Sequence, residues 1–224
     1  MRRALTSILK VGIFELVIAL VLFGSAGRTD LPWFWALIAV HATGLLAGHL
    51  AMDPGLDRER LNPAAGGPAG KEYAFRIGGT VAILTHLAVA GLDVGRFHWS
   101  VPPPAALRVV ALVVYAAGLG FSMWAIATNC FFSSVVRLQS DRGHHVIDTG
   151  PYGYIRHPGY AGMMVAALSG GVVLGSWWSV VPMLLFGVMV VRRLAMEDRF
   201  LNAHLDGYRE YSGRVRSKVL PGVW

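Results

Sequence analysis

The chain has 224 residues, of which 54% are hydrophobic and 15% are charged, and its mean hydropathy of +0.51 is too high for an ordinary soluble domain and typical of an integral membrane protein. Its net charge of +7 does not indicate nucleic-acid binding, because the basic residues are scattered between long apolar runs, where contact with anionic lipid explains them better. The single cysteine, Cys130, excludes an internal disulfide and a cysteine-based metal cluster, and no metal is expected.

Six apolar segments approach or reach the roughly 20 helical residues that cross a bilayer. They are residues 8–25, 31–52, 77–94, 105–128, 160–174 and 178–194. The last two are short and separated only by Gly175, Ser176 and Trp177, which predicts a tight helical hairpin with tryptophan at a membrane interface. The first has the charged start of a signal peptide but no cleavage site before a soluble domain, so we interpret it as a retained helix.

The Lys and Arg residues predict the orientation of these segments. If both termini are cytoplasmic, 17 of the 20 Lys and Arg residues lie on the cytoplasmic side, and only Arg28, Arg96 and Arg108 lie opposite. Because cytoplasmic loops of membrane proteins carry an excess of basic residues, this bias predicts cytoplasmic termini and a cytoplasmic segment 129–158.

Two further segments lie outside the predicted spans. Residues 53–76 include a Gly- and Pro-rich run ending in Lys71, but Ala65 and Glu72 do not fit a phosphate-binding loop, so a flexible connector is predicted. Near the C-terminus, Leu201, Leu205, Tyr208 and either Tyr211 or Ser212 recur at helical spacing, which predicts an amphipathic tail helix at the cytoplasmic interface.

The stretch from Gly143 to Tyr160 is the most unusual part of the chain. It contains three turn signals, Gly150-Pro151, Tyr152-Gly153 and Pro158-Gly159, between two long apolar runs. Long loops without regular structure are uncommon and usually bind a ligand. We therefore expect the chemistry of the protein in this stretch.

Two blocks of residues in the last part of the chain resemble one enzyme family. The first block is Thr149-Gly150-Pro151-Tyr152 with Arg156-His157-Pro158-Gly159-Tyr160, and the second is Glu197-Asp198-Arg199-Phe200-Leu201 with Gly207, Tyr208, Tyr211 and Leu220-Pro221-Gly222-Val223-Trp224. In this order they resemble the isoprenylcysteine carboxyl methyltransferase family and its phospholipid N-methyltransferase relatives. The resemblance covers residues 129–224, and the first 128 residues carry no matching motif.

The resemblance implies a fold, a cofactor and a set of site residues. It implies N-terminal transmembrane helices in residues 1–128 and a region in residues 129–224 that binds S-adenosylmethionine at the cytoplasmic face and methylates a lipidic acceptor. The implied cofactor-binding residues are Gly150, Pro151, Tyr152, Arg156, His157, Tyr160, Glu197 and Asp198. The implied catalytic residues are Arg156 and His157, and Asn129 and Arg156 are the implied substrate-binding residues. The family usually has two glutamates where this chain has Glu197 and Asp198, which makes Glu197 the stronger candidate.

Residue chemistry supports two of these roles and offers plainer alternatives. An arginine such as Arg156 presents a fork of donors that fits a carboxylate of the cofactor or the acceptor, although it also suits a lipid anchor. Glu197 accepts from hydroxyl or ammonium groups, although a surface pair with Arg193, worth about 0.3–0.5 kcal/mol, is the plainer alternative. Asn129 is equally suited to be a helix C-cap. His144 and His145 are expected to be solvated loop residues.

Four ionisable residues lie inside the predicted spans, where such groups are costly and usually functional: Glu15, His41, His49 and His86. The histidines could bind haem, but hydrogen bonds to Thr43 or Thr85, or pairing with Glu15, are the simpler interpretation.

The sequence therefore predicts an all-α, polytopic membrane protein with about six transmembrane helices, a C-terminal hairpin and an amphipathic tail helix. Its predicted function is that of an S-adenosylmethionine-dependent methyltransferase for a hydrophobic acceptor, with a carboxylate favoured over an amine. An NADPH-dependent sterol-type reductase is the first alternative, although that family usually has asparagine where Gly159 stands. A non-enzymatic haem- or quinone-binding membrane protein is the second. The acceptor and the oligomeric state stay open.

Overall fold

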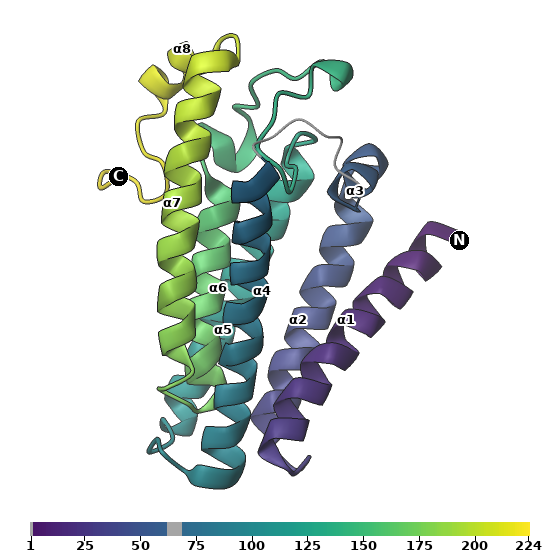
Figure 1. The fold of residues 1–224 in the computed structure, drawn as a ribbon, viewed down its shortest axis with the longest axis vertical. Helices are drawn as coiled ribbons and strands as arrows, with labels where there is room; N and C mark the ends of the chain where they lie inside the picture. The colour runs from purple at the N-terminus through teal and green to yellow at the C-terminus, as the bar shows by residue number, and fades with distance from the viewer. Residues whose placement is uncertain (1, 62–68) are drawn as a thin grey trace.

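The computed structural model describes residues 2–61 and 69–224, and in these ranges the chain is helical and contains no strand. Its α-helices are α1 (Arg2–Ala26), α2 (Pro32–Ala51), α3 (Pro54–Leu61), α4 (Ala69–Leu92), α5 (Ala105–Thr128), α6 (Pro158–Leu174), α7 (Val180–His204) and α8 (Tyr208–Arg214). The chain also contains the short π-helix η1 (Asp93–Phe97) and the 3₁₀-helices η2 (Ser140–Arg142) and η3 (Gly150–Gly153). The long helices form one bundle, and α3, α8 and the chain between α5 and α6 lie at one of its ends (Figure 1).

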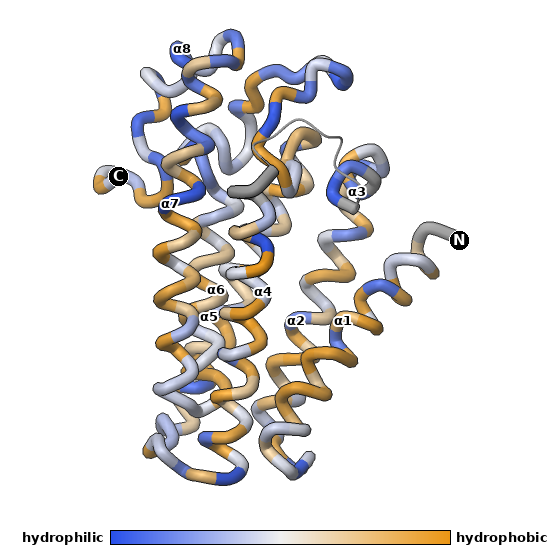
Figure 2. Tube along the Cα trace, in the orientation of Figure 1, coloured by the Kyte–Doolittle hydropathy of each residue, from blue (hydrophilic) through white to orange (hydrophobic). Residues whose placement is uncertain are grey.

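Four segments within the described ranges are long and apolar enough to cross a membrane: Ala4–Ala26, Pro32–Ala51, Tyr73–Phe97 and Ala105–Thr128. They coincide with the first four predicted spans. α6 adds a shorter apolar helix of 17 residues, and α7 pairs with it in the predicted hairpin. Hydrophobic residues follow the helical shafts, and hydrophilic residues gather at the end that carries α3 and α8 (Figure 2). The prediction of an all-helical polytopic membrane protein is confirmed.

Close contact between α5 and α6 sets the position of the turn-rich stretch. A Cβ atom added at Gly162 would lie 2.4 Å from the carbonyl oxygen of Gly118 and 2.6 Å from the amide nitrogen of Ser122, so only glycine permits this approach. The Ser122 hydroxyl also donates to the carbonyl oxygen of Gly159 at 3.1 Å. The first turn of α6 is therefore held against α5.

A buried carboxylate fixes the opposite end of the hairpin. Asp93, which is fully buried, accepts hydrogen bonds from the amide and hydroxyl of Ser100 at 2.8 and 2.6 Å and from the hydroxyl of Ser176 at 2.5 Å. Arg108 donates to the carbonyl oxygens of Val173 and Leu174, both at 3.0 Å, at the C-terminal end of α6. These contacts join the turn after α4 and the start of α5 to the turn between α6 and α7.

The structure differs from the predictions outside the spans. The segment 53–76 contains α3 and the first turns of α4, although residues 62–68 of the predicted connector lie outside the described residues. The prediction of one continuous amphipathic tail helix is wrong. Helix α7 continues to His204, and a break at Gly207, with φ of 77°, separates it from α8. The predicted apolar face exists nonetheless, since Leu201, Leu205, Tyr208 and Tyr211 belong to one hydrophobic cluster.

The ionisable residues within the spans have partners other than the predicted threonines. The Nδ1 atom of His41 lies 2.7 Å from Oε1 of Glu15, which confirms the predicted pairing with Glu15. The rings of His49 and His86 contact the carbonyl oxygens of Leu45 and Ser179, at 3.0 and 2.7 Å. In the ranges that the structure describes, no three His, Cys, Asp or Glu side chains converge as a metal site would require.

Candidate active site

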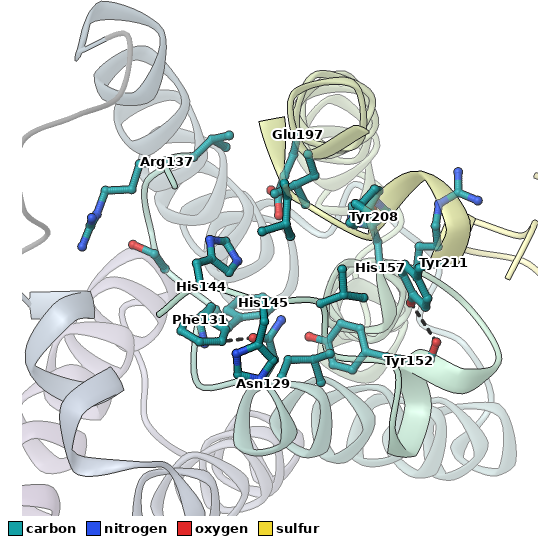
Figure 3. A pocket seen from close by; sticks show the side chains of 18 of the residues that line it. Asn129, Phe131, Arg137, His144, His145, Tyr152, His157, Glu197, Tyr208 and Tyr211 are labelled. Carbon is teal, nitrogen blue, oxygen red and sulfur yellow. Dashed lines mark hydrogen bonds between the residues drawn. The ribbon is translucent and has the colours of Figure 1, made fainter. Parts of the chain in front are cut away.

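A cavity opens at the end of the bundle that carries α8, and it lies beside the turn-rich stretch. Its walls come from three parts of the chain, residues 129–147, residues 152–160 and residues 197–211. The space between its lining side chains, counted together with the opening to solvent, is about 740 Å³. The side chains that line it converge from the end of α5, the start of α6, the end of α7 and α8 (Figure 3).

Aromatic rings form much of the cavity wall. The lining aromatic residues are Phe131, Phe132, Tyr152, Tyr160, Tyr208 and Tyr211. The ring of Phe131 lies 4.5 Å from that of His144 and 5.0 Å from that of His145, centroid to centroid. Such faces offer stacking surfaces for a planar ring and for a cation.

The acidic side chain that faces the cavity is Glu197. Its Oε2 atom accepts a hydrogen bond from the hydroxyl of Tyr160 at 2.6 Å, and that hydroxyl accepts one from Nε of Arg193 at 2.9 Å. The Oε1 atom of Glu197 accepts no hydrogen bond from the described part of the chain. The site therefore presents a carboxylate oxygen that is oriented through its partner oxygen and is available to a donor.

The neighbouring Asp198 points into the protein and binds four side chains. It accepts hydrogen bonds from Nε and Nη2 of Arg156 at 2.8 and 3.1 Å, from Nε2 of His157 at 3.2 Å and from the Tyr208 hydroxyl at 3.1 Å. Lys218 lies 3.6 Å away as an ion pair. Burial alone would raise the pKa of Asp198, but the hydrogen bonds and charges of His157 and Arg156 outweigh it and hold that pKa below its ordinary value.

Arg156 is engaged by the protein itself. Two of its nitrogens bind Asp198, and Nη1 donates to the carbonyl oxygens of Val215 and Arg216 at 2.7 and 2.8 Å. In the structure this fork holds a carboxylate of the chain, and its predicted role, in which it grips a carboxylate of the cofactor or the acceptor, stays a prediction. Arg156 lines the cavity, but its guanidinium ties the end of α7 to the segment after α8.

The segment after α8 returns along the start of α6. The amides of Arg156 and His157 donate to the carbonyl oxygens of Ser217 and Lys218 at 3.0 and 2.8 Å. The Tyr211 hydroxyl donates to the carbonyl oxygen of Tyr152 at 2.8 Å (Figure 3). These bonds fix α8 and the tail of the chain to the start of α6 and to the turn at Tyr152.

The turn at Gly150 and the end of α5 complete the wall. Gly150 has φ of 57°, which favours glycine, and it begins the turn that buries Pro151 and Tyr152. Asn129 was predicted to be either a helix C-cap or a residue of the site. It is both, because it caps α5 and lines the cavity. Its Oδ1 atom accepts from the amide of Phe131 at 2.9 Å (Figure 3).

Most of the predicted site residues come together, and three do not reach the cavity. Those that line it are Asn129, Tyr152, Arg156, His157, Tyr160 and Glu197. Gly150, Pro151 and Asp198 lie behind this layer and shape it. Their predicted contact with a cofactor stays a prediction.

Sequence reasoning missed two histidines of the site. Both line the cavity; His144 is partly buried, whereas His145 is also exposed to solvent, as predicted for a loop residue. Burial, followed by the nearby charges of His145, Arg137 and Arg142, lowers the pKa of His144 to about 4, so its ring is neutral at pH 7. Their position just before the apolar pair Val146-Ile147, which also lines the cavity, was the available signal.

Together, the fold and the site define a polytopic α-helical membrane protein with an aromatic-walled cavity that opens at one end of its bundle. Residues 109–203 match the sequence model of the isoprenylcysteine carboxyl methyltransferase (ICMT) family. The protein-S-isoprenylcysteine O-methyltransferase of Schizosaccharomyces pombe is 30% identical over 93 residues, a match that covers 39% of this chain and 38% of that protein. Two proteins named as probable protein-S-isoprenylcysteine O-methyltransferases, from Oryza sativa subsp. indica and subsp. japonica, are 31% identical over 151 residues, which covers 66% of this chain and 75% of each of them.

The chain belongs to the isoprenylcysteine carboxyl methyltransferase family. The residues that match the family model include the close α5–α6 contact, the turn at Gly150 and the Glu197–Asp198 pair. They exclude α3, which contacts the wall of the cavity, and α8, which forms part of it.

Proposed function

We propose that this protein is a membrane methyltransferase that binds S-adenosylmethionine in the cavity and methylates a hydrophobic acceptor. The main observation behind the proposal is that two adjacent carboxylates face different surroundings. Asp198 is held by Arg156, His157 and Tyr208, whereas Glu197 faces an aromatic cavity with one oxygen available. Membership of a methyltransferase family supports the proposal.

The residues that line the cavity fit the chemistry of this methyl donor. Glu197 is suited to the ribose hydroxyls or the ammonium group, because a carboxylate only accepts hydrogen bonds. The aromatic faces around Phe131 suit an adenine ring and a sulfonium cation. His144, kept neutral by burial, adds no positive charge that would repel a cation. We propose residues 129–224 as the region that binds the methyl donor.

Methyl transfer requires mainly that the methyl donor and the acceptor are aligned and that water is excluded. When bound, S-adenosylmethionine supplies a methyl group on a sulfonium; the acceptor oxygen bonds to that carbon as the carbon–sulfur bond breaks, and the electron pair remains on sulfur. An ionised carboxylate acceptor needs no general base, whereas an amine would need one. The contribution of the chain is a fixed, partly enclosed wall that orients both partners and keeps water out. In this proposal Arg156 and His157, which both bind Asp198, stabilise that wall.

The proposed acceptor is a prenylated cysteine or a compound with the same features, an apolar chain and a free carboxylate. The names of the relatives in S. pombe and rice support this class. Membrane lipids surround the apolar helices, and the site lies at the end of the bundle, so an acceptor with an apolar chain can approach from the bilayer.

The test of the acceptor is methyl transfer from labelled S-adenosylmethionine to N-acetyl-S-farnesylcysteine in detergent or vesicles. We expect a base-labile methyl ester to form, and we expect the matching carboxamide to accept no methyl group. Transfer to an amine-bearing lipid but not to the carboxylate would contradict the proposed acceptor class.

We propose that the cavity and both termini face the cytoplasm, because 17 of the 20 Lys and Arg residues lie on that side of the predicted topology. In the bundle both termini lie toward the end that carries α8 (Figure 1). In a Cys130→Ser background, we expect an impermeant thiol reagent to label Val101→Cys in intact cells and to label Asp206→Cys only after permeabilisation. Both positions lie in exposed turns between helices, at opposite ends of the bundle. Labelling of Asp206→Cys in intact cells would contradict the orientation.

A further inference from the structure

A short helix from the N-terminal half of the chain contacts the wall of the cavity. α3 lies outside the residues that match the family model, and its Glu59 binds Arg137 through two parallel hydrogen bonds. Nε of Arg137 lies 3.1 Å from Oε1 of Glu59, and Nη2 lies 3.1 Å from Oε2. The side chains of Glu59 and Arg137 are 8% and 6% exposed, so the pair is buried. Bidentate, buried arginine–carboxylate pairs are the strong and geometrically specific ones.

Arg137 is a cavity residue whose charged end faces α3. The residue lines the cavity, but its side chain extends away from the other labelled side chains (Figure 3). Its Nη1 atom donates to Asp141 at 2.8 Å, whose side chain is 58% exposed. The Ser133 hydroxyl, from another lining residue, donates to Glu59 at 3.1 Å. Glu59 therefore holds the cavity wall at two points.

The next residue of α3 adds a third contact to the same wall. Nη1 of Arg60 donates to the carbonyl oxygen of Phe132 at 3.2 Å, and its guanidinium lies 5.4 Å from the Phe132 ring. The same ring packs closely on α6, since a Cβ atom added at Gly159 would lie 2.5 Å from it. Leu56 of α3 is fully buried in a small cluster that Phe132 joins.

The wall segment 131–137 has no helix of its own and is held from two sides. α3 holds it through Glu59 and Arg60, and Nη2 of Arg193 in α7 donates to the carbonyl oxygen of Ser134 at 2.9 Å. An irregular segment has no hydrogen-bond ladder to define its path, so these side-chain bonds determine where Phe131 and Phe132 stand. Loss of the α3 contacts would release one side of the wall.

We propose that Glu59 is a positioning residue for the cavity, which acts through Arg137 and Ser133 to hold segment 131–137 in its ligand-binding conformation. The inference rests on the proposed function for the identity of the ligand, but the placement of the wall is independent of it. It assigns to α3 a role in the site, although α3 lies outside the family match.

The test compares Glu59→Gln with Asp57→Asn on the same helix. Asp57, whose side chain is 27% exposed, pairs with Lys10 at 2.9 Å, and in the described part of the chain no hydrogen bond joins it to segment 131–137, which makes it the control. We expect Glu59→Gln to weaken binding of S-adenosylhomocysteine about tenfold and to speed amide hydrogen exchange in residues 131–142. At saturating methyl donor the turnover number should change little. Asp57→Asn should leave the affinity and the local exchange rates unchanged.

A second pair of variants keeps the test decisive if Glu59→Gln folds poorly. Glu59→Asp retains the charge with a shorter reach, and it should give intermediate exchange in residues 131–142. The double variant Glu59→Gln/Arg137→Gln should lose less affinity than the sum of its single changes, because it leaves no unpaired buried charge. Unchanged exchange in residues 131–142 of a folded Glu59 variant would overturn the inference. If the wild-type protein binds no S-adenosylhomocysteine, the proposed function fails, and the exchange measurement alone then decides the role of Glu59.

Discussion

Replacement of Asp198 by asparagine is expected to cause the largest loss of stability of any single change at the site. The carboxylate accepts from Arg156, His157 and Tyr208 while being only 5% exposed. Removal of one partner from a buried ion pair costs about 3–5 kcal/mol, because the other charge stays buried without compensation. The amide of an asparagine would also direct a donor toward the donors of Arg156. We therefore expect the thermal midpoint in detergent to fall by roughly 10 °C and ligand binding to be lost.

The matched control for this change is Asp148→Asn. Asp148 also pairs with an arginine, Arg214, at 2.8 Å, but the two side chains are 43% and 68% exposed. An exposed pair is worth about 0–1 kcal/mol, so Asp148→Asn should hardly change the thermal midpoint. Similar midpoints for the two variants would contradict the structural role of Asp198.

Because the pKa of Asp198 is lowered in the folded protein, its contribution to folding stability depends on pH. A carboxyl group whose pKa is lower in the folded than in the unfolded state stabilises the fold at pH values above its unfolded pKa of about 4. The contribution is lost as the pH falls below that value. The difference in the free energy of unfolding between the wild type and Asp198→Asn should therefore be largest near pH 7 and decrease below about pH 4.

Glu197→Gln is expected to have the largest effect on ligand affinity in a protein that stays folded. The substitution keeps the shape of the side chain but removes its charge, and a hydrogen bond to a charged group is worth about 1.5–3 kcal/mol. We expect calorimetry to show binding of S-adenosylhomocysteine weakened tenfold or more, with a thermal midpoint close to that of the wild type. Glu210→Gln, on the exposed face of α8, is the matched control and should leave the affinity unchanged.

A comparison with Tyr160→Phe distinguishes two roles of Glu197, binding of the ligand and support of the cavity wall. The hydroxyl of Tyr160 connects Arg193 to Glu197, so its removal disturbs the same network without touching the carboxylate. If Glu197 binds the ligand, Glu197→Gln should reduce the affinity far more than Tyr160→Phe does. Equal, small effects on affinity with equal effects on stability would mean that Glu197 serves only to hold Tyr160.

The spans and the hairpin were predictable because their causes are local. Length and apolarity decide whether a helix can cross a bilayer, and the run Gly175-Ser176-Trp177 is short enough to force α6 and α7 together. α3 was not predictable in this way. Its sequence is short, begins Pro54-Gly55 and is then mostly charged, and its place depends on tertiary contacts made by Leu56 and Glu59.

The sequence indicated which residues belong to the candidate site, but not how their side chains are arranged in it. The motifs indicate that Arg156 and the Glu197–Asp198 pair belong together, although 42 residues separate Arg156 from Asp198. Which of two adjacent helical residues faces the cavity depends on the rotation of α7, since successive side chains point about 100° apart. The sequence cannot supply that angle. For the same reason it suggested that Arg156 grips a ligand, whereas the fold supplies Asp198 as its partner.

The central claim is that the cavity binds S-adenosylmethionine. Titration calorimetry of the detergent-solubilised wild-type protein, with S-adenosylhomocysteine and NADPH as parallel ligands, tests it most directly. We expect saturable binding of S-adenosylhomocysteine with one site per chain and no heat beyond dilution from NADPH. Saturable binding of NADPH without any response to S-adenosylhomocysteine would contradict the claim and favour a reductase.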